Sequence, residues 1–264
     1  MPALTSTPRD IFDRHRRAVR RGRLPALPGY FDSLIVDRLI ERLGDVSRAF
    51  DRGLLIGGRD KTIASALRER CAQVTIAEAS PVLAARVGAL CADEDRLPLD
   101  PDSYDLIVWP GGLEGVNDVP GALLRCRYAL RPDGLLLGCV IGDGSFPTLR
   151  RCMAAADAPH VTARMHPQLS LQSLCDLLGR IGLTQIVADG EAITLSYATF
   201  AALLRDVRDG ALGNVLAGPV QPISRSGYAR AQAAFCGEAG DRRVIEQVRL
   251  IHFSGWIPAA SPHV

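Results

Sequence analysis

The chain has almost no lysine and little excess charge of either sign. Of its 31 basic residues, all but Lys61 are arginine, and the formal net charge is only +2. A nearly neutral chain gives no support for a nucleic-acid-binding protein, because such proteins need a concentrated positive surface to meet phosphates. The preference for arginine over lysine matches a GC-rich coding sequence better than a chemical need.

The chain also lacks any regular cysteine pattern. It has no C-x-x-C pair, and its seven cysteines are scattered as Cys71, Cys91, Cys126, Cys139, Cys152, Cys175 and Cys236. This pattern is typical of reduced, mostly buried thiols rather than of a disulfide framework. No His-x-x-x-His or Cys/His grouping predicts a metal site, so none is expected. No Gly-x-Ser-x-Gly elbow is present either, which argues against a hydrolase.

Long apolar runs are missing as well. No run approaches the ~20 residues that a membrane helix needs, and the N-terminus has no apolar signal core. We therefore expect a cytoplasmic protein without a transmembrane segment and without a nucleic-acid partner. Its 264 residues and 47% apolar content suit one large domain, or one domain with a cap.

The first 30 residues form a basic arm, followed by a domain at residues 31–258 and a tail at 259–264. Seven arginines lie between Arg9 and Arg23. A transit peptide, a membrane-surface helix and a solvated arm are all compatible with this composition. We favour an arm that packs on its own domain, because Ile11, Phe12, Val19 and Leu24 give it apolar side chains to bury.

Strand-like and helix-like patterns alternate through the first 145 residues. We predict strands at residues 54–56, 74–77, 104–109, 135–141, 182–187, 193–196 and 244–253. We predict helices at residues 31–43, 61–70, 81–90, 119–130, 146–156, 169–181, 197–207 and 227–236. This order predicts βαβ units, and hence an α/β protein with a mostly parallel sheet. A helical insertion at about 197–240 is predicted to cap the ligand edge of that sheet.

Several polar residues are expected to serve structure alone. Asp105 stands at the entrance of a strand, and Asn117-Asp118 precedes a helix as a cap would. Residues 131–134 read as a turn between a helix and the next strand. These residues are therefore not counted among the chemical candidates.

The stretch from Arg52 to Lys61 is the most informative motif. An apolar strand runs into Gly57-Gly58, and a helical pattern follows. Glycines at such a turn let the backbone approach a cofactor closely, while free N–H groups at the helix start offer hydrogen bonds. A full G-x-G-x-G would need glycine at 57, 59 and 61, but Arg59 and Lys61 occupy the last two places.

Further motifs follow in the order and spacing of one superfamily. They are the glycine loop, Glu78 at the end of the next strand, Asp93-Glu94-Asp95-Arg96-Leu97-Pro98, Tyr104-Asp105-Leu106-Ile107-Val108 and Leu130-Arg131-Pro132-Asp133-Gly134. Together they resemble class I S-adenosylmethionine (SAM)-dependent methyltransferases. The resemblance implies a Rossmann-like fold with a seven-stranded, mostly parallel sheet.

Flanking motifs narrow the resemblance to one branch. They lie at residues 11–14, 116–123, 203–208, 222–225 and 254–258. They are similar to the methyltransferase-like proteins of bacteria and mitochondria that are related to a respiratory complex I assembly factor. The biotin-pathway malonyl-carrier-protein methyltransferase is a more distant relative. The resemblance spans roughly residues 9–258.

The resemblance implies a SAM site at the carboxyl ends of the strands. Glu78, followed by Ala79, would accept both ribose hydroxyls, because a carboxylate is a strong bidentate acceptor. The other residues implied are Gly57, Gly58 and Arg59 at the amino-acid part of SAM, Asp93 and Glu94 at the adenine, and Trp109 and Gly111 on the methionine side.

The chain departs from this branch at several positions. Relatives usually have Asp at Leu55, Gly at Arg59 and Lys61, and a His-Trp pair at Glu114-Gly115. Arg59 brings a cation near the sulfonium and ammonium of SAM, unless its side chain points away or pairs with the carboxylate of SAM. These departures leave open whether SAM affinity is kept, weakened or lost.

Two functions therefore remain open. The first is a SAM-dependent methyltransferase acting on a small-molecule or protein acceptor. The second is a degenerate or non-methylating assembly factor for respiratory complex I, and the resemblance also allows modification of an arginine on a partner protein. Four cap residues either gate an acidic or protein substrate or form a charged helix face: Arg205, Asp206, Arg208 and Asn214.

Overall fold

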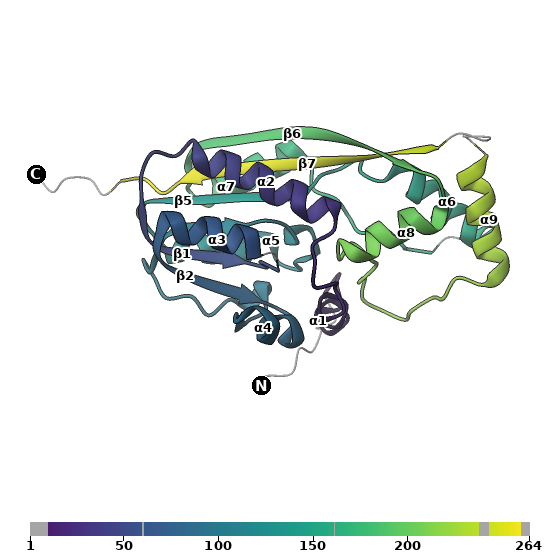
Figure 1. Ribbon diagram of the computed structural model, residues 1–264, viewed down its shortest axis with the longest axis horizontal. Helices are drawn as coiled ribbons and strands as arrows, with labels where there is room; N and C mark the ends of the chain where they lie inside the picture. Colours follow the sequence, from purple (N-terminus) through teal and green to yellow (C-terminus); the bar gives the residue numbers. More distant parts are fainter. Residues whose placement is uncertain (1–9, 60, 161, 238–242, 260–264) are drawn as a thin grey trace, which may run out of the picture.

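The computed structural model describes residues 10–59, 61–160, 162–237 and 243–259. Its centre is one seven-stranded sheet in the order β3-β2-β1-β4-β5-β7-β6 (Figure 1). The strands are β1 (Phe50–Ile56), β2 (Cys71–Glu78), β3 (Leu90–Cys91), β4 (Tyr104–Trp109), β5 (Leu130–Ile141), β6 (Thr184–Tyr197) and β7 (Val244–Trp256). β1 to β5 pair in parallel, whereas β7 is antiparallel to β5 and β6. This arrangement confirms the predicted α/β class.

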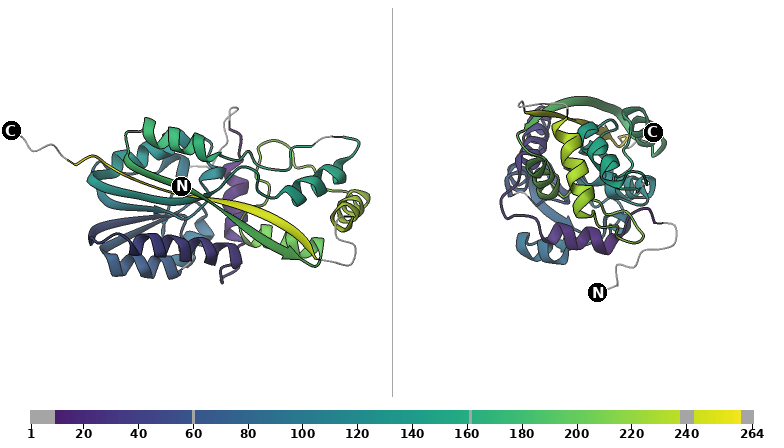
Figure 2. Two further views of the ribbon diagram at one scale, coloured as in Figure 1. Left: turned by 90° about the horizontal axis from the view of Figure 1, so that it is seen from above. Right: turned by 90° about the vertical axis from the view of Figure 1, so that its right-hand side faces the viewer.

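Helices cover both faces of the sheet (Figure 2). One face carries α2 (Tyr30–Gly44) and α3 (Lys61–Arg70), and the other carries α5 (Val119–Ala129) and α7 (Leu171–Arg180). Leu39 and Leu67 belong to one buried apolar cluster, and Leu123 and Leu174 belong to the second. Because helices cover it on both sides, a central strand such as β4 is apolar along most of its length.

The cap helices are α6 (Pro147–Asp157), α8 (Phe200–Asp209) and α9 (Arg225–Cys236). They gather at one end of the molecule, beside the long extensions of β6 and β7 (Figure 1). The rings of Phe200 and Phe235 lie 5.7 Å apart and join α8 to α9. The cap helices therefore stand beyond the carboxyl ends of the parallel strands.

The start of α6 depends on a residue from far along the chain. Phe146 precedes the helix in the left-handed conformation and provides no side-chain cap. Glu246 of β7 accepts hydrogen bonds from the backbone N–H groups of Thr148 (3.1 Å) and Leu149 (2.8 Å) instead. A buried carboxylate thus satisfies two of the unpaired donors that every helix start leaves.

One detail of the predicted strands is wrong. The separate strands at 182–187 and 193–196 are one strand, β6, which pairs with β7 from Thr184 to Tyr197. The polar middle of β6 is held by α2, where Arg38 pairs with Glu191 and Arg42 pairs with Asp189.

The turn predicted at 131–134 falls within the bounds of β5. The strand is irregular there, because its pairing with β4 jumps from Leu130 to Leu135 and Asp133 has a φ of +61°.

Other element boundaries also differ from the predictions. Tyr197 ends β6, so the predicted helix at 197–207 begins only at Phe200. The predicted helix at 81–90 is shorter, because α4 (Pro81–Val87) is followed by Gly88 in the left-handed conformation and then by β3. The structural roles expected for two residues are confirmed. Asp105 accepts the backbone N–H groups of β1, and Asp118 caps α5.

The described part of the basic arm contains helix α1 (Arg14–Gly22). Phe12 and Leu24 are buried as expected, whereas Ile11 and Val19 are exposed. Residues 1–9 of the arm and residues 260–264 of the tail lie outside the described residues. Within the part of the chain that the structure describes, no helix is both long and apolar enough to cross a membrane.

Candidate cofactor site

The carboxyl ends of β1, β2 and β4 meet at one edge of the sheet. Parallel pairing places Ile56 beside Ala77, so Gly57 and Glu78 follow at neighbouring strand ends. Gly57 has a φ of +76°, and its N–H donates to the carbonyl of Ala77 at 2.8 Å. A φ of this sign favours glycine, because a β-carbon would be strained there. The chain therefore makes a tight turn at Gly57, as the glycine motif predicted.

Gly58 is fixed by packing. A β-carbon at this position would lie 2.2 Å from Cδ2 of Leu55. Leu55 is completely buried, in the cluster that lies under α2 and α3. Leu55, where the family resemblance implies an aspartate, is thus a core position in this chain.

Glu78 is fully buried at the end of β2 and holds a guanidinium group of α1. Arg21 donates from Nε to Oε1 at 2.7 Å and from Nη2 to Oε2 at 2.6 Å. The N–H of Ser80 donates to Oε1 at 2.9 Å. Arg21 also reaches the carbonyl of Gly57 at 3.1 Å. Both oxygens of the predicted ribose acceptor are therefore occupied by a residue of the same chain.

The same face of α1 binds the next acidic segment, η1 (Glu94–Arg96). Arg17 donates to both oxygens of Glu94 at 3.1 and 3.0 Å. Arg14 donates to Asp95 at 3.1 Å and lies 3.5 Å from Asp93. The three arginines, at positions 14, 17 and 21, lie on one helical stripe. α1 thus crosses the strand ends with a row of cations directed at a row of carboxylates.

The charges of this row are well compensated at Glu78 and less so at Glu94. Burial opposes the ionisation of Glu78, but the charge and hydrogen bonds of Arg21 outweigh it and hold the pKa of this carboxyl below its usual value. Burial raises the pKa of Glu94, and the charges of Arg17 and Arg21 offset this only in part. The bonds from Arg21 to Glu78, at 2.7 and 2.6 Å, are also shorter than those from Arg17 to Glu94, at 3.1 and 3.0 Å.

The close packing of α1 is visible at Gly22. A β-carbon there would lie 2.9 Å from Oγ of Ser80, the residue that caps α4. On the opposite side, Asn117 accepts the N–H of Phe12 at 2.8 Å and donates to its carbonyl at 3.1 Å. The arm is therefore held on both sides of α1, by close packing at Gly22 and by hydrogen bonds at Phe12.

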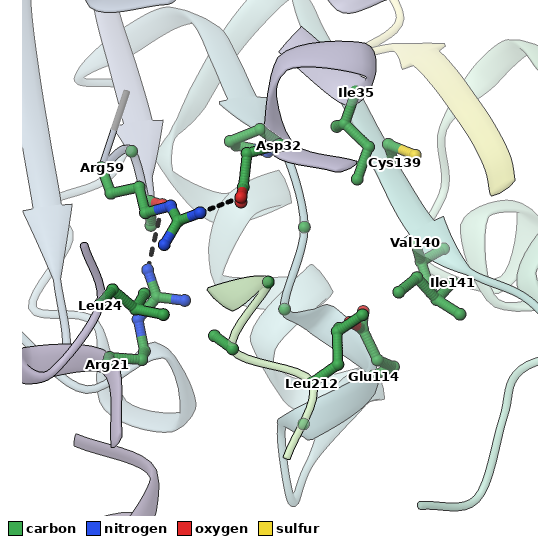
Figure 3. A pocket seen from close by; sticks show the side chains of 18 of the residues that line it. Arg21, Leu24, Asp32, Ile35, Arg59, Glu114, Cys139, Val140, Ile141 and Leu212 are labelled. Atoms are coloured by element: carbon green, nitrogen blue, oxygen red, sulfur yellow. Dashed lines mark hydrogen bonds and ion pairs between the residues drawn. The ribbon is translucent and has the colours of Figure 1, made fainter. Parts of the chain in front are cut away.

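A cavity of about 90 Å³ remains between α1, the glycine loop and the residues after β4 (Figure 3). Arg21 and Arg59 lie on one side of it, and Glu114 and Leu212 lie on the other. Arg59 is paired with Asp32 of α2. Its charge is thus compensated by a carboxylate of the protein, a partner that the sequence analysis did not predict.

Glu114 and His166 line this cavity and were not predicted. Burial raises the pKa of Glu114, and its Oε2 has no hydrogen-bond partner among the described residues. Burial and the charges of Arg17 and Arg20 lower the pKa of His166 to about 4. His166 is therefore neutral near pH 7 and accepts the N–H of Val215 at 2.9 Å.

The remaining predicted cofactor residues lie at the same edge but serve different contacts. Ala79 is buried beside Glu78, and Trp109 is completely buried at the end of β4. Asp93 caps η1 by accepting the N–H of Asp95 at 3.0 Å. Gly111 has a φ of +154° and lines the cavity. Of the predicted set, Gly57, Gly58, Arg59 and Gly111 line the cavity, whereas Ala79 and Trp109 do not.

The predicted cap residues do not form one cluster. Arg205 and Arg208 are exposed on α8, whereas Asp206 accepts the hydroxyl of Tyr197 at 2.9 Å. Asn214 donates to the carbonyl of Ala163 and accepts the N–H of Leu216. Within the described ranges, no group of three or more His, Cys, Asp or Glu residues could hold a metal ion.

The sequence reasoning missed the arginines of α1 as site residues. Their spacing of three and four positions carried the signal, because it places them on one helix face. The partner carboxylates were recognised for Glu78 and Glu94. Asp95 was noted only as part of a motif, although it accepts from Arg14, Asn117 and the N–H of Asp118.

The types of residue at the site fit a SAM-like cofactor, but the space between them is too small to hold one. A buried carboxylate ends β2, and a glycine turn lies beside it, as a nucleoside at a sheet edge requires. However, Arg21 holds both carboxylate oxygens, and about 90 Å³ is well below the ~300–1,000 Å³ typical of small-molecule sites. A nucleoside that used Glu78 as its acceptor would therefore require α1 to move away from this carboxylate.

Comparison with known proteins gives consistent matches. A family model described as a methyltransferase domain matches residues 29–188. A rat protein named arginine-hydroxylase NDUFAF5, mitochondrial, is 30% identical over 230 residues, which are 78% of this chain and 66% of the relative. The chain thus spans just under two thirds of that relative. A malonyl-[acyl-carrier protein] O-methyltransferase of Laribacter hongkongensis is 30% identical over 250 residues, 86% of this chain and 83% of the relative.

Solved structures show the same fold. A putative methyltransferase from Bacillus halodurans has a TM-score of 0.56 at 10% identity, covering 85% of this chain and 99% of that chain. The YcgJ protein from Bacillus subtilis has a TM-score of 0.56 at 15% identity, covering 86% and 100%. At such identities the likeness concerns the fold alone.

Proposed function

Because the chain belongs to the methyltransferase family whose model covers residues 29–188, we propose that it is a SAM-dependent methyltransferase whose cofactor competes with α1 for Glu78. The acceptor is a small molecule or a protein. Glu78 carries this proposal, since it is completely buried and ends the second strand of a class I sheet, where a carboxylate can accept two ribose hydroxyls.

SAM supplies a methyl group on a sulfonium, which is already a reactive donor and asks little of acid–base residues. The chain would contribute binding and alignment. Glu78 would orient the ribose, and the backbone at Gly57 and Gly111 would allow close approach. Glu114 faces the same cavity and would lie near the methionine part.

A titration with S-adenosylhomocysteine tests this proposal. The variant Arg21→Met frees Glu78, and Glu78→Ala in that background removes the ribose acceptor. Loss of charge-assisted hydrogen bonds of this kind costs about 1.5–3 kcal/mol, or roughly ten- to over a hundredfold in affinity. We expect the variant with both Arg21→Met and Glu78→Ala to bind S-adenosylhomocysteine more weakly than Arg21→Met by this factor. If neither the unaltered protein nor Arg21→Met binds the nucleoside, the assignment is wrong.

A second candidate is a non-methylating assembly factor for a respiratory complex that modifies an arginine of a partner protein. One observation favours it. The acids of this site already hold arginine guanidinium groups, and the rat relative bears the name arginine-hydroxylase. Binding of an arginine-containing peptide to Arg21→Met, lost on Glu78→Ala, without any nucleoside binding, would select this candidate over methyl transfer.

A further inference from the structure

A second and larger cavity of about 460 Å³ lies under the cap helices. Its walls come from α1, α6, α8 and the segment at residues 211–214. Ala211 and Leu212 line both this cavity and the smaller one beside Glu78. We call it the cap cavity. Its volume falls in the ~300–1,000 Å³ range of sites that enclose small molecules.

The floor of the cap cavity is apolar. Leu149 and Met153 of α6 face Leu204 and Val207 of α8 across it. Leu149, Met153 and Val207 are buried, and Leu204 is partly buried. An apolar surface of this kind gains free energy when an alkyl chain replaces water. A methionine in the wall also adapts readily to the shape of a chain.

The rim of the cap cavity is cationic. Arg20 and Arg23 of the arm and Arg208 of α8 line it. The structure gives none of these three side chains a carboxylate partner or a hydrogen bond among the described residues. The fourth arginine, Arg164, is already paired with Asp157 through two bonds of 2.6 Å. Asp209 is the one acid of the lining.

Arg20 of the rim is repelled by neighbouring arginines of the arm. Burial lowers the pKa of Arg20, and the neighbouring charges of Arg16 and Arg23 lower it further. This contrasts with the opposite face of α1, where each arginine meets a carboxylate. An anion at the rim would relieve the repulsion and would gain charge-assisted hydrogen bonds.

We propose that the cap cavity binds an amphipathic anion, in which a single alkyl chain lies on the floor and a carboxylate or phosphate head meets Arg20, Arg23 and Arg208. The two heads share the required chemistry, a compact oxyanion that arginine binds in a planar, forked arrangement. The residues that would hold the anion are distinct from those at Glu78, and the test below therefore contains no cofactor.

The test measures binding to the full chain by calorimetry, below the micelle concentration of each probe. Dodecanoate and dodecyl phosphate carry the chain and an anionic head, and their comparison identifies the preferred head. Dodecyltrimethylammonium keeps the chain and reverses the charge, whereas butanoate keeps the carboxylate and shortens the chain. We expect at least one of the two dodecyl anions to bind, and both control ligands to bind at least tenfold more weakly.

Two charge reversals on α8 form a matched pair. Arg208 lines the cap cavity, whereas Arg205 is exposed on the same helix and is absent from the lining. Arg208→Glu is expected to weaken binding of the anion about tenfold or more, and Arg205→Glu to leave it within about twofold. Equal effects of the two variants would mean a diffuse electrostatic attraction and would overturn the proposal.

A variant of the apolar floor tests whether the alkyl chain enters the cap cavity or the anion is held by surface charge alone. Leu204→Gln places a polar group where the chain is expected to lie, and its partial burial lets the fold be checked by circular dichroism. Weaker binding of the dodecyl anion in the folded variant supports the site. Unchanged binding by Leu204→Gln, binding of the dodecyl cation as tight as that of the anions, or no binding of either anion would overturn it.

Discussion

Replacing Arg21 by methionine separates two effects of one ion pair. The side chains are buried, with exposed fractions of 10% for Arg21 and 0% for Glu78. Two hydrogen bonds of 2.7 and 2.6 Å join them. Removal of one partner from such a pair leaves an uncompensated buried charge and costs about 3–5 kcal/mol of stability. We expect a loss of this order in the free energy of unfolding.

The same substitution is expected to tighten nucleoside binding. In the unaltered protein, a ligand that uses Glu78 must first break the bonds of Arg21. Charge-assisted bonds of this kind contribute about 1.5–3 kcal/mol. Since Arg21→Met lacks them before the ligand arrives, its dissociation constant for the nucleoside should be lower by roughly ten- to over a hundredfold. Methionine keeps an unbranched apolar stem, which preserves much of the packing of α1.

Urea unfolding measures the first effect, and calorimetric titration with S-adenosylhomocysteine measures the second. Arg38→Met is the matched control. Arg38 also donates two nitrogens to a carboxylate, that of Glu191, but this pair joins α2 to β6 and is partly exposed. Its loss should cost much less stability than the loss of the buried pair and leave nucleoside affinity unchanged. If folded Arg21→Met binds the nucleoside no better than the unaltered protein, α1 does not compete with it.

Three further outcomes follow from single contacts. The pKa of Glu78 is lowered in the folded state, so the stability that its charge contributes is complete above about pH 4.3 and is lost as the pH falls through the lower folded value. The difference in unfolding free energy between the unaltered protein and Glu78→Ala should therefore narrow in acid. A difference that widens in acid would contradict the pairing with Arg21. Glu246→Ala should destabilise the protein by about 1–3 kcal/mol, because two amides at the start of α6 lose their acceptor, and a thermal melt that does not shift would exclude this role. Asp105→Ala should cost a similar amount, because the N–H groups of Asp51 and Arg52 donate to this carboxylate at 2.7 and 2.9 Å; the same melt measures it, and Asp105→Asn should recover part of the loss.

The sequence determined the class of the fold and the place of its glycine turn. Apolar strand patterns, helix patterns and glycine positions are local features, and each depends on residues only a few places apart. For this reason the parallel strands β1, β2, β4 and β5, the turn at Gly57 and the acid at the end of β2 were predicted at or near their positions, whereas the two-residue strand β3 was not predicted. The edge strand β6 was predicted only as two separate strands, because its polar middle is held by arginines of α2 more than 140 residues away in sequence.

The tertiary structure alone decided what the carboxylates of the site bind. Seven arginines lie between Arg9 and Arg23, and no local pattern pairs them individually with acids. Arg21 and Glu78 are 57 positions apart, and Arg17 and Glu94 are 77 apart. Such pairs form only when the assembled sheet brings the ends of β2 and η1 under one face of α1. Over these distances the charge partner is set by the packing of whole elements, so no local pattern could identify it.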